Sequence, residues 1–210
     1  MEAKPIKYEW KPFALVLAAL IALEACSDFF CEDPYIAAGI VRLLDAAVIV
    51  AAALVFGPAA RLPGIIPPQI KKGLVRGAIW SAGFGCIAAI VGAIFYAAGF
   101  APLDMINVSL PKTTGRLLVF FAVGGIVSPF AEELIFRGVL FGVLRRWGAL
   151  AAILGSSLLF AIAHNTGGIP VVQAAGGLVF ALSYEMEKNL LVPVIIHVTG
   201  NLALFTIALL

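Results

Sequence analysis

The chain has 210 residues, of which 62% are hydrophobic and only 12% are charged. A water-soluble domain needs a polar surface that this composition cannot supply, so the sequence indicates an integral membrane protein. Its 14 basic and 12 acidic residues give a formal net charge of +2, and the basic residues lie in short clusters between apolar runs, which excludes a nucleic-acid-binding groove. Three cysteines are too few for a disulfide scaffold or a CxxC metal site.

Seven long apolar segments follow one another along the chain, and each is predicted to be a membrane-spanning helix. They run from Pro12 to Phe30, Tyr35 to Phe56, Leu74 to Phe100, Arg116 to Arg145, Leu150 to Asn165, Ile169 to Tyr184 and Leu190 to Leu210. Helices rather than barrel strands are indicated because the runs are continuous and many far exceed the length of a barrel strand. The predicted fold is therefore all-α, a polytopic transmembrane helical bundle of about seven spans, or eight, forming a single domain over residues 1–210.

Glycine and proline mark the breaks between these segments. The stretch from Gly57 to Pro68 is the clearest linker between two helices, and Asn165 to Pro170 reads as a tight turn between two spans.

The placement of lysine and arginine predicts how the bundle lies in the membrane. Short loops rich in these residues stay in the cytoplasm. With a cytoplasmic N-terminus, eleven basic residues fall on the inner side, and only Arg42, Lys112 and Arg116 fall on the outer side. A cleaved signal peptide is the alternative, but Glu24 beside the candidate cleavage site favours an uncleaved first span. We therefore expect a bacterial inner-membrane protein with its N-terminus in the cytoplasm.

The segment from Ser128 to Gly138 carries three ionisable residues between long apolar runs. Ionisable groups inside a bilayer are costly and mark functional sites. At about 100° per residue, Glu133 and Arg137 lie on nearly one helical face, whereas Glu132 points about 140° away from Arg137. A structural salt bridge explains Glu133 and Arg137 but leaves Glu132 without a partner. We predict that Glu132 is free to meet a substrate or water.

The chain has two histidines, His164 and His197, and both fall in predicted spans. Phe160 precedes His164 by four residues, and His197 precedes Asn201 by four, so each pair shares a helical face. A single buried histidine is more often a satisfied hydrogen-bonding group than a catalyst. Because both histidines lie in the bilayer and a glutamate is unpaired, we predict one shared site.

The expected depths support this convergence, because a helix rises about 1.5 Å per residue. Glu132 lies roughly 20 Å from the basic pair at Arg145, His164 about 22 Å from the turn before it, and Asn201 roughly 20 Å from Lys188. Three antiparallel spans would thus bring their polar groups to one level. The sequence predicts a water-filled pocket at mid-membrane or slightly outward.

Three motifs in residues 128–210 resemble those of a known family. They are EExxxR at Glu132–Arg137, FxxxH at Phe160–His164 and HxxxN at His197–Asn201. In this order, each on a hydrophobic segment, they resemble the CPBP family of intramembrane proteases, which includes CAAX prenyl endopeptidases of the Rce1 type and bacteriocin-processing relatives. The resemblance marks residues 128–210 as the catalytic half. The N-terminal half matches only in being apolar, and seven spans is one fewer than family members commonly have.

The resemblance implies a peptidase that needs no metal or other cofactor. It implies that Glu132 and His164 activate a water that attacks the scissile peptide carbonyl, and that His197 and Asn201 hold the oxyanion. The same resemblance gives supporting roles to Glu133, Arg137 and Phe160.

Other functions remain open from the sequence. Glu132, His164 and His197 are also the ligand set of a catalytic zinc site, although no HExxH motif is present. A non-catalytic scaffold or immunity protein of the same fold is the alternative from another class, but no motif residue is missing. A transporter is disfavoured because the chain has no obvious repeated half.

The expected partners are the lipid bilayer and a membrane-associated protein or peptide substrate, with no nucleic acid. The sequence does not name the substrate, the oligomeric state or whether Cys26 and Cys31 pair. The outward bias of the predicted site favours a substrate in the outer leaflet or outside the membrane.

Overall fold

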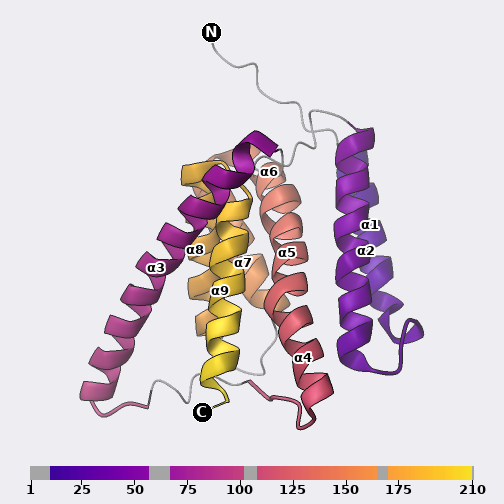
Figure 1. Cartoon of the computed structure of the whole chain (residues 1–210). Helices are drawn as coiled ribbons and strands as arrows, with labels where there is room; N and C mark the ends of the chain where they lie inside the picture. Colours follow the sequence, from indigo (N-terminus) through magenta and orange to yellow (C-terminus); the bar gives the residue numbers. More distant parts are fainter. Residues whose placement is uncertain (1–9, 57–66, 102–107, 165–169, 210) are drawn as a thin grey trace.

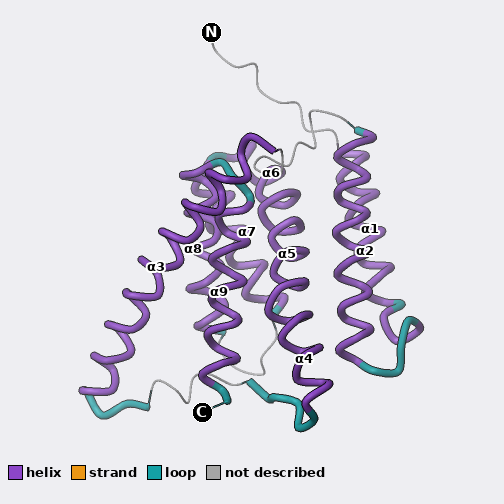
Figure 2. Tube along the Cα trace, viewed as in Figure 1, coloured by secondary structure: helices purple, strands orange, loops and turns teal. Residues whose placement is uncertain are grey.

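The structure is a computed structural model that describes residues 10–56, 67–101, 108–164 and 170–209. Every regular element in these residues is helical, so the predicted all-α class is confirmed (Figure 2). Within the described ranges the segments form seven consecutive helical rods, one for each predicted apolar segment. Six of the rods are α1 (Trp10–Ala25), α2 (Pro34–Val55), α3 (Pro67–Ala97), α7 (Ala149–Ala163), α8 (Val171–Glu187) and α9 (Leu191–Ile207), with a short 3-10 turn, η1 (Ser27–Phe29), after α1.

The remaining rod, residues 114–147, changes its hydrogen-bonding pattern along its length. Two π-helical stretches flank the short segment that carries the paired glutamates. Such π-helical turns occur frequently at functional sites. The rod consists of α4 (Thr114–Ala122), η4 (Val123–Val127), α5 (Ser128–Glu133), η5 (Leu134–Leu140), α6 (Phe141–Leu144) and the 3-10 turn η6 (Arg145–Trp147).

Helices from distant parts of the sequence pack side by side. The last helix, α9, contacts α3, α5 and α8, and α7 packs along α8. The hairpin of α1 and α2 joins this group because α2 contacts α4, α5 and both π-helical stretches. The start of α1 and the end of α9 lie at opposite ends of the bundle (Figure 1).

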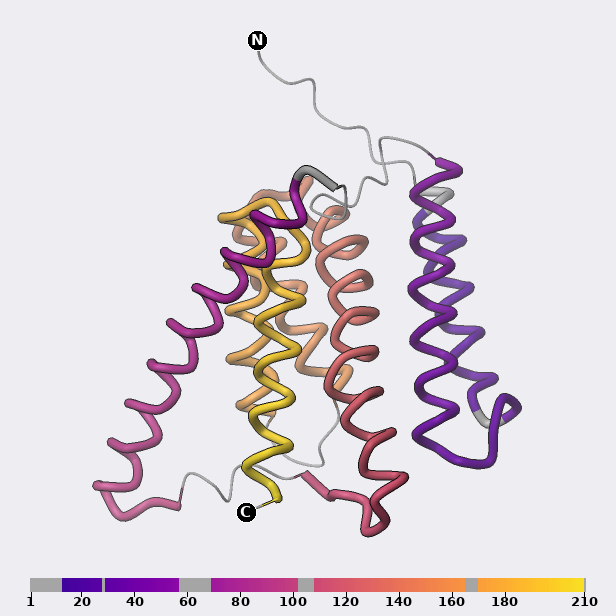
Figure 3. The backbone as a smooth tube through the Cα atoms, in the orientation of Figure 1, coloured from indigo at the N-terminus to yellow at the C-terminus, as the bar shows by residue number. Residues whose placement is uncertain are grey.

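Helix α3 meets α9 only along its first half. A Cβ added at Gly77 would lie 2.7 Å from the Cβ of Ile195, so glycine is required for this close approach. Further along α3, a Cβ at Gly83, Gly85 or Gly92 would meet nothing within 4 Å. The second half of α3 accordingly diverges from α9 (Figure 3).

Three of the described helices are long and apolar enough to cross a membrane, and the chain is an integral membrane protein. They cover Pro34–Val55, Gln69–Ala97 and Thr114–Trp147. Large apolar side chains such as Leu54, Ile94 and Leu118 are exposed on their outer faces, as lipid-facing side chains would be. Three shorter apolar helices, Phe13–Ala25, Ala149–Ala163 and Leu191–Ile207, complete the apolar layer.

Several predicted boundaries need correction. The linker was expected to reach Pro68, but α3 already begins at Pro67, because proline fits the first helical turn, where its missing N–H costs no hydrogen bond. Most of that linker and residues 165–169 of the predicted turn lie outside the described residues. The fifth rod ends at Ala163 and not at Asn165. Cys26 and Cys31 are free thiols.

Several of the basic residues counted in the predicted loops lie inside helices, among them two that sit within apolar spans. Arg42 belongs to α2, and Arg137 belongs to η5. Removing both leaves ten basic residues on the predicted inner side and two on the outer side, so the charge bias is unchanged in direction.

We predict a cytoplasmic N-terminus and a C-terminus on the outer side, because short basic loops resist translocation. Reporter domains fused to each end of the chain test this in cells. A C-terminal reporter that is active only in the cytoplasm would contradict the orientation.

Candidate active site

The structure brings together side chains from three helices that the sequence expected at one depth. Glu132 lies on α5, His164 directly follows α7, and His197 lies in α9. Oε2 of Glu132 is 3.3 Å from Nε2 of His164 and 3.7 Å from Nε2 of His197. This Oε2 atom is buried and makes no hydrogen bond with the described residues. The expected free glutamate therefore faces both imidazole rings.

Glu133 binds two other side chains in the buried part of the site. Its Oε1 lies 2.9 Å from Nη1 of Arg137 and 2.9 Å from Nδ1 of His197. The side chains of Glu133 and Arg137 are completely buried, and that of His197 is 4% exposed. The predicted pair of Glu133 with Arg137 is present, but sequence reasoning missed that Glu133 also binds His197. That contact joins α9 to α5, and no sequence spacing reveals it.

Arg137 is also held by the backbone of α8. Its Nη2 donates to the carbonyl of Gly177 at 2.8 Å, and Oγ of Ser157 donates to the same oxygen at 2.9 Å. A Cβ at Gly177 would lie 3.2 Å from the ring of Phe160 and 3.3 Å from the carbonyl of Ser157. Glycine thus lets α7 and α8 come close enough to reach Arg137. Sequence reasoning missed Gly177 and Ser157, which belong to none of the motifs.

Aromatic rings pack against both histidines. The Phe160 ring centroid is 4.3 Å from that of His164 and 5.5 Å from that of His197, and the Arg137 guanidinium lies 4.9 Å from the same ring. Phe180 stacks on His197 at 4.5 Å with an angle of 21° between the planes. These contacts agree with the supporting role expected for Phe160. Phe180 was missed because a phenylalanine in an apolar helix gives no distinct signal.

His164 directly follows its helix and lies one residue before the predicted end of the span at Asn165. Its φ of −93° and ψ of 59° end α7 after Ala163. Nδ1 of the ring lies 2.8 Å from the carbonyl oxygen of Phe160. A carbonyl oxygen only accepts hydrogen bonds, so we assign the proton to Nδ1. In a neutral ring, Nε2 then presents a lone pair toward Glu132.

Asn201 lies in α9 four residues after His197, and its side chain bonds to another rod. Its Nδ2 donates to the carbonyl of Gly124 in η4 at 2.9 Å. The π-helical pattern explains why this oxygen is available: the N–H of Ser128 bonds to Val123, and the next residue, Pro129, has no N–H to donate. Asn201 supplies the missing donor, which fixes its carboxamide plane and ties α9 to the fourth rod.

The charges of the site suggest how its protons are arranged. Ionised Glu132 and Glu133 with Arg137 leave one uncompensated negative charge, which is costly in an apolar bundle. His197 presents Nδ1 to Glu133 and Nε2 to Glu132, so a protonated ring would serve both carboxylates. His197 is therefore placed to donate from Nδ1 to Glu133, whereas His164 donates from Nδ1 to the carbonyl of Phe160.

The ligand types of the site suit zinc, but their arrangement differs from a metal cluster. Within the described ranges, no group of three or more His, Cys, Asp or Glu side chains is placed to hold a metal ion. Here Nδ1 of both histidines is already engaged by a protein oxygen, and Nε2 of both faces one carboxylate oxygen. Zinc coordination would need the three side chains to rearrange around an ion.

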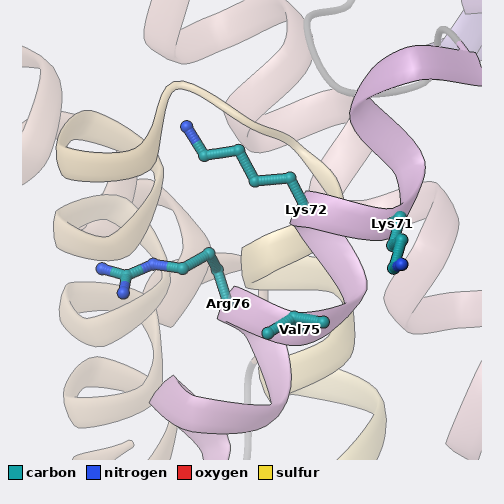
Figure 4. A pocket seen from close by; sticks show the side chains of 4 residues that line it. All are labelled: Lys71, Lys72, Val75 and Arg76. Atoms are coloured by element: carbon teal, nitrogen blue, oxygen red, sulfur yellow. The ribbon is translucent and has the colours of Figure 1, made fainter.

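A cavity of about 400 Å³ lies on the N-terminal turns of α3. Lys71, Lys72, Val75 and Arg76 line it (Figure 4). Its lining shares no residue with the candidate active site. The water-filled pocket expected at Glu132 stays a prediction.

We predict that Glu133→Gln lowers stability more than Glu132→Gln does. The first change leaves Arg137 buried without its counter-charge, a loss that typically costs about 3 to 5 kcal/mol. Thermal unfolding of both variants and the unchanged chain in the same detergent gives the comparison. Equal melting temperatures for the two variants would contradict the division of roles between the glutamates.

Comparisons with known proteins support the motif assignment. Residues 114–203 match the family model described as Type II CAAX prenyl endopeptidase Rce1-like. The "Membrane-embedded CAAX protease MroQ" of Staphylococcus aureus (strain USA300) is 38% identical over 92 residues, which are 40% of this chain and 36% of that protein. The "Putative membrane peptidase YdiL" of Bacillus subtilis (strain 168) is 36% identical over 80 residues, 38% of this chain and 33% of that protein.

The matched segments thus span only about a third of these relatives. No solved structure matches the chain. The family match covers all three motifs, from Glu132 to Asn201. The predicted resemblance is therefore confirmed: residues 114–203 of the chain are similar to the Rce1-like CAAX protease family.

Proposed function

We propose that this chain is an intramembrane endopeptidase that hydrolyses a peptide bond in a membrane-associated protein, with a water molecule activated by Glu132 and His164. The observation that carries the proposal is the approach of Glu132 Oε2 to Nε2 of both histidines, at 3.3 and 3.7 Å. A carboxylate and a neutral imidazole side by side can each accept a proton from water. The printed names of both relatives, a protease and a peptidase, agree with this chemistry.

The first step is activation of the water. One O–H donates to Glu132 and the other to the Nε2 lone pair of His164, so the oxygen lone pair is directed at the scissile carbonyl. As the oxygen attacks, one proton passes to Glu132 and the new C–O bond forms.

The second step places negative charge on the former carbonyl oxygen. The protonated Nε2 of His197 is the donor for this oxyanion, because Nδ1 of the same ring is held by Glu133 at 2.9 Å. Asn201 has a second N–H besides the one given to Gly124, and this N–H is the other proposed donor. Preorganised donors in a dry site stabilise such charge more strongly than donors in water.

Collapse of the intermediate completes the reaction. The C–N bond breaks, and the proton held by Glu132 passes to the leaving nitrogen, which regenerates the carboxylate. One water is consumed, and one acid and one amine are formed. Glu133, Arg137 and Phe160 take no proton in this scheme, because they position His197 and the helix that carries Glu132.

The proposal assigns the catalytic work to residues 128–210, within one transmembrane domain over residues 1–210. The bilayer location supports a substrate held in or beside the membrane, and a bacterial plasma membrane is the proposed location. Prenylated tails, sorting-signal tails and leader peptides are the candidate substrates. His164 lies at the end of α7 nearest the predicted outer side, which favours a substrate that enters from that side.

A non-catalytic scaffold or immunity protein is the main alternative. Its function would depend on the bundle and not on the proton-accepting oxygen of Glu132. A conservative change at this residue separates the two functions.

We predict that Glu132→Gln abolishes cleavage while leaving the fold intact, because the amide keeps the size of the side chain but cannot accept the proton of water. Mass spectrometry of membrane peptides compares cells carrying the unchanged chain with cells carrying Glu132→Gln or Glu132→Ala. Peptides that accumulate only with the unchanged chain identify the substrates. Identical peptide sets in all three strains would favour the non-catalytic alternative.

We also predict that activity needs no bound metal and that Asn201→Ala loses turnover rather than substrate affinity. An oxyanion donor at His197 presents a proton, whereas a zinc ligand presents a lone pair, and one nitrogen cannot do both. Loss of one oxyanion donor commonly costs about 10²-fold to 10³-fold in kcat. The purified enzyme is assayed with and without chelator, and its zinc content is measured. Chelator inactivation reversed by zinc would assign the histidines to a metal instead.

A further inference from the structure

Arg42 is a charged residue inside a helix that spans the membrane, and the catalytic scheme does not use it. It was counted with the outer loops in the sequence, but it lies eight positions beyond Pro34, the first residue of α2. This places it about 12 Å from the start of the helix. A charge within an apolar span marks a functional site unless packing alone explains it.

The packing of α2 against the fourth rod places Arg42 beside the active site. The two rods run in the same direction, because three contacting pairs share an offset of 83 to 85 positions along the chain. These pairs are Asp33 with Arg116, Tyr35 with Phe120, and Gly39 with Val123.

With this offset, Arg42 lies about five residues, or roughly 7 Å, to the predicted outer side of Glu132. The long side chain of arginine can cover much of this distance. The charge of Arg42 also contributes to the electrostatic field at both Glu132 and His164. The guanidinium therefore lies close to where a bound peptide would meet the catalytic residues.

Two carboxylates hold Arg42, and they differ in exposure. Nη1 bonds to Asp45 at 2.8 Å, and the Asp45 side chain is only 2% exposed. Glu24 of α1 binds across Nη1 and Nη2 at 3.1 and 3.2 Å, and its side chain is 58% exposed. Asp45 is thus the buried partner of Arg42. Glu24 is the exposed partner, and it binds both terminal nitrogens of the guanidinium.

We propose that Arg42 is a carboxylate-binding subsite, where a carboxylate of the substrate replaces Glu24 within two or three residues of the scissile bond. The inference rests on the proposed peptidase function. A carboxylate of the chain itself already binds the fork with two contacts, which is the geometry that arginine offers to carboxylates. The exchange replaces one carboxylate by another on the same two nitrogens, so the number of charge-assisted hydrogen bonds to Arg42 is unchanged.

The arrangement keeps the charge of the subsite balanced during the exchange. Asp45 stays on Nη1 while one carboxylate leaves and another arrives, so no buried charge is created. The Nε–H and one N–H of Nη2 bond to nothing in the described part of the chain and remain available as further donors. A substrate with a carboxylate near the cut would bind more tightly than its amide counterpart.

The test compares two peptides taken from one Glu132-dependent cleavage site found in cells. They differ only in a Glu or a Gln within three residues of the cut. The full chain is reconstituted in phosphatidylcholine vesicles, and KM and kcat are measured for both peptides. We expect KM for the acidic peptide to be about tenfold lower, as charge-assisted hydrogen bonds would give, with similar kcat.

Three variants show whether Arg42 causes the preference. Arg42→Gln is expected to equalise the two KM values. Arg42→Lys keeps a positive charge beside Asp45, so the fold is retained. The lysine ammonium lacks the two parallel N–H donors of the guanidinium, so the preference for the acidic peptide should fall severalfold. Glu24→Gln removes the competing carboxylate and is expected to lower KM for the acidic peptide severalfold without affecting stability.

Arg116→Gln is the matched control, because this outer-side arginine also pairs with a carboxylate, that of Asp33 at 3.0 Å. It should leave the preference unchanged. No preference in the unchanged chain, or a full preference in both Arg42 variants, would overturn the subsite while leaving the peptidase function in place. Absence of any Glu132-dependent product would overturn the peptidase function and the subsite together.

Discussion

The site depends on keeping a charged network neutral where water is scarce. Glu133 and Arg137 are completely buried, and removal of either partner would strand the other in an apolar bundle. Glu133 stabilises Arg137 and His197 through the same oxygen, and Arg137 in turn binds the carbonyl of Gly177. One salt bridge thereby fixes α5, α8 and α9 relative to one another. The position of Glu132 follows, because it is the chain neighbour of Glu133.

The backbone takes part in this arrangement as much as the side chains do. The carbonyl of Phe160 fixes the ring of His164, and the carbonyl of Gly124 fixes the amide of Asn201. Both are oxygens that a regular helix would satisfy internally, and they are available at a helix end and in a π-helical turn before Pro129. A hydrogen bond to a backbone oxygen sets both the orientation of a side chain and, for histidine, which nitrogen carries the proton. Local irregularity of the helices therefore prepares the site for proton transfer.

The sequence predicted the parts of this site that depend on periodicity. Helical spacing separated Glu132 from Glu133, and the depth argument placed the two histidines near Glu132. It could not predict the bond between His197 and Glu133, because contacts between helices depend on their rotation and tilt. The π-helical stretches could not be predicted either, because they change the rotation per residue from the roughly 100° of a regular α-helix. Likewise, Gly177 and Phe180 have no distinguishing pattern in the sequence, because their contacts with the site form only when the helices pack together.

The N-terminal hairpin carries no motif of the family match, yet it can shape what the site accepts. Helix α2 brings a cation to the outer side of Glu132, and the buried Asp45 holds it there. The positive charge of Arg42 is opposite to the charge of Glu132 and Glu133, so this position attracts the carboxylates that the two glutamates repel. Glu24 then protects the cation from the bilayer until a competing carboxylate arrives. In the proposed scheme the chemistry resides in the C-terminal half, and the N-terminal hairpin selects the peptide through the charge that it places beside the site.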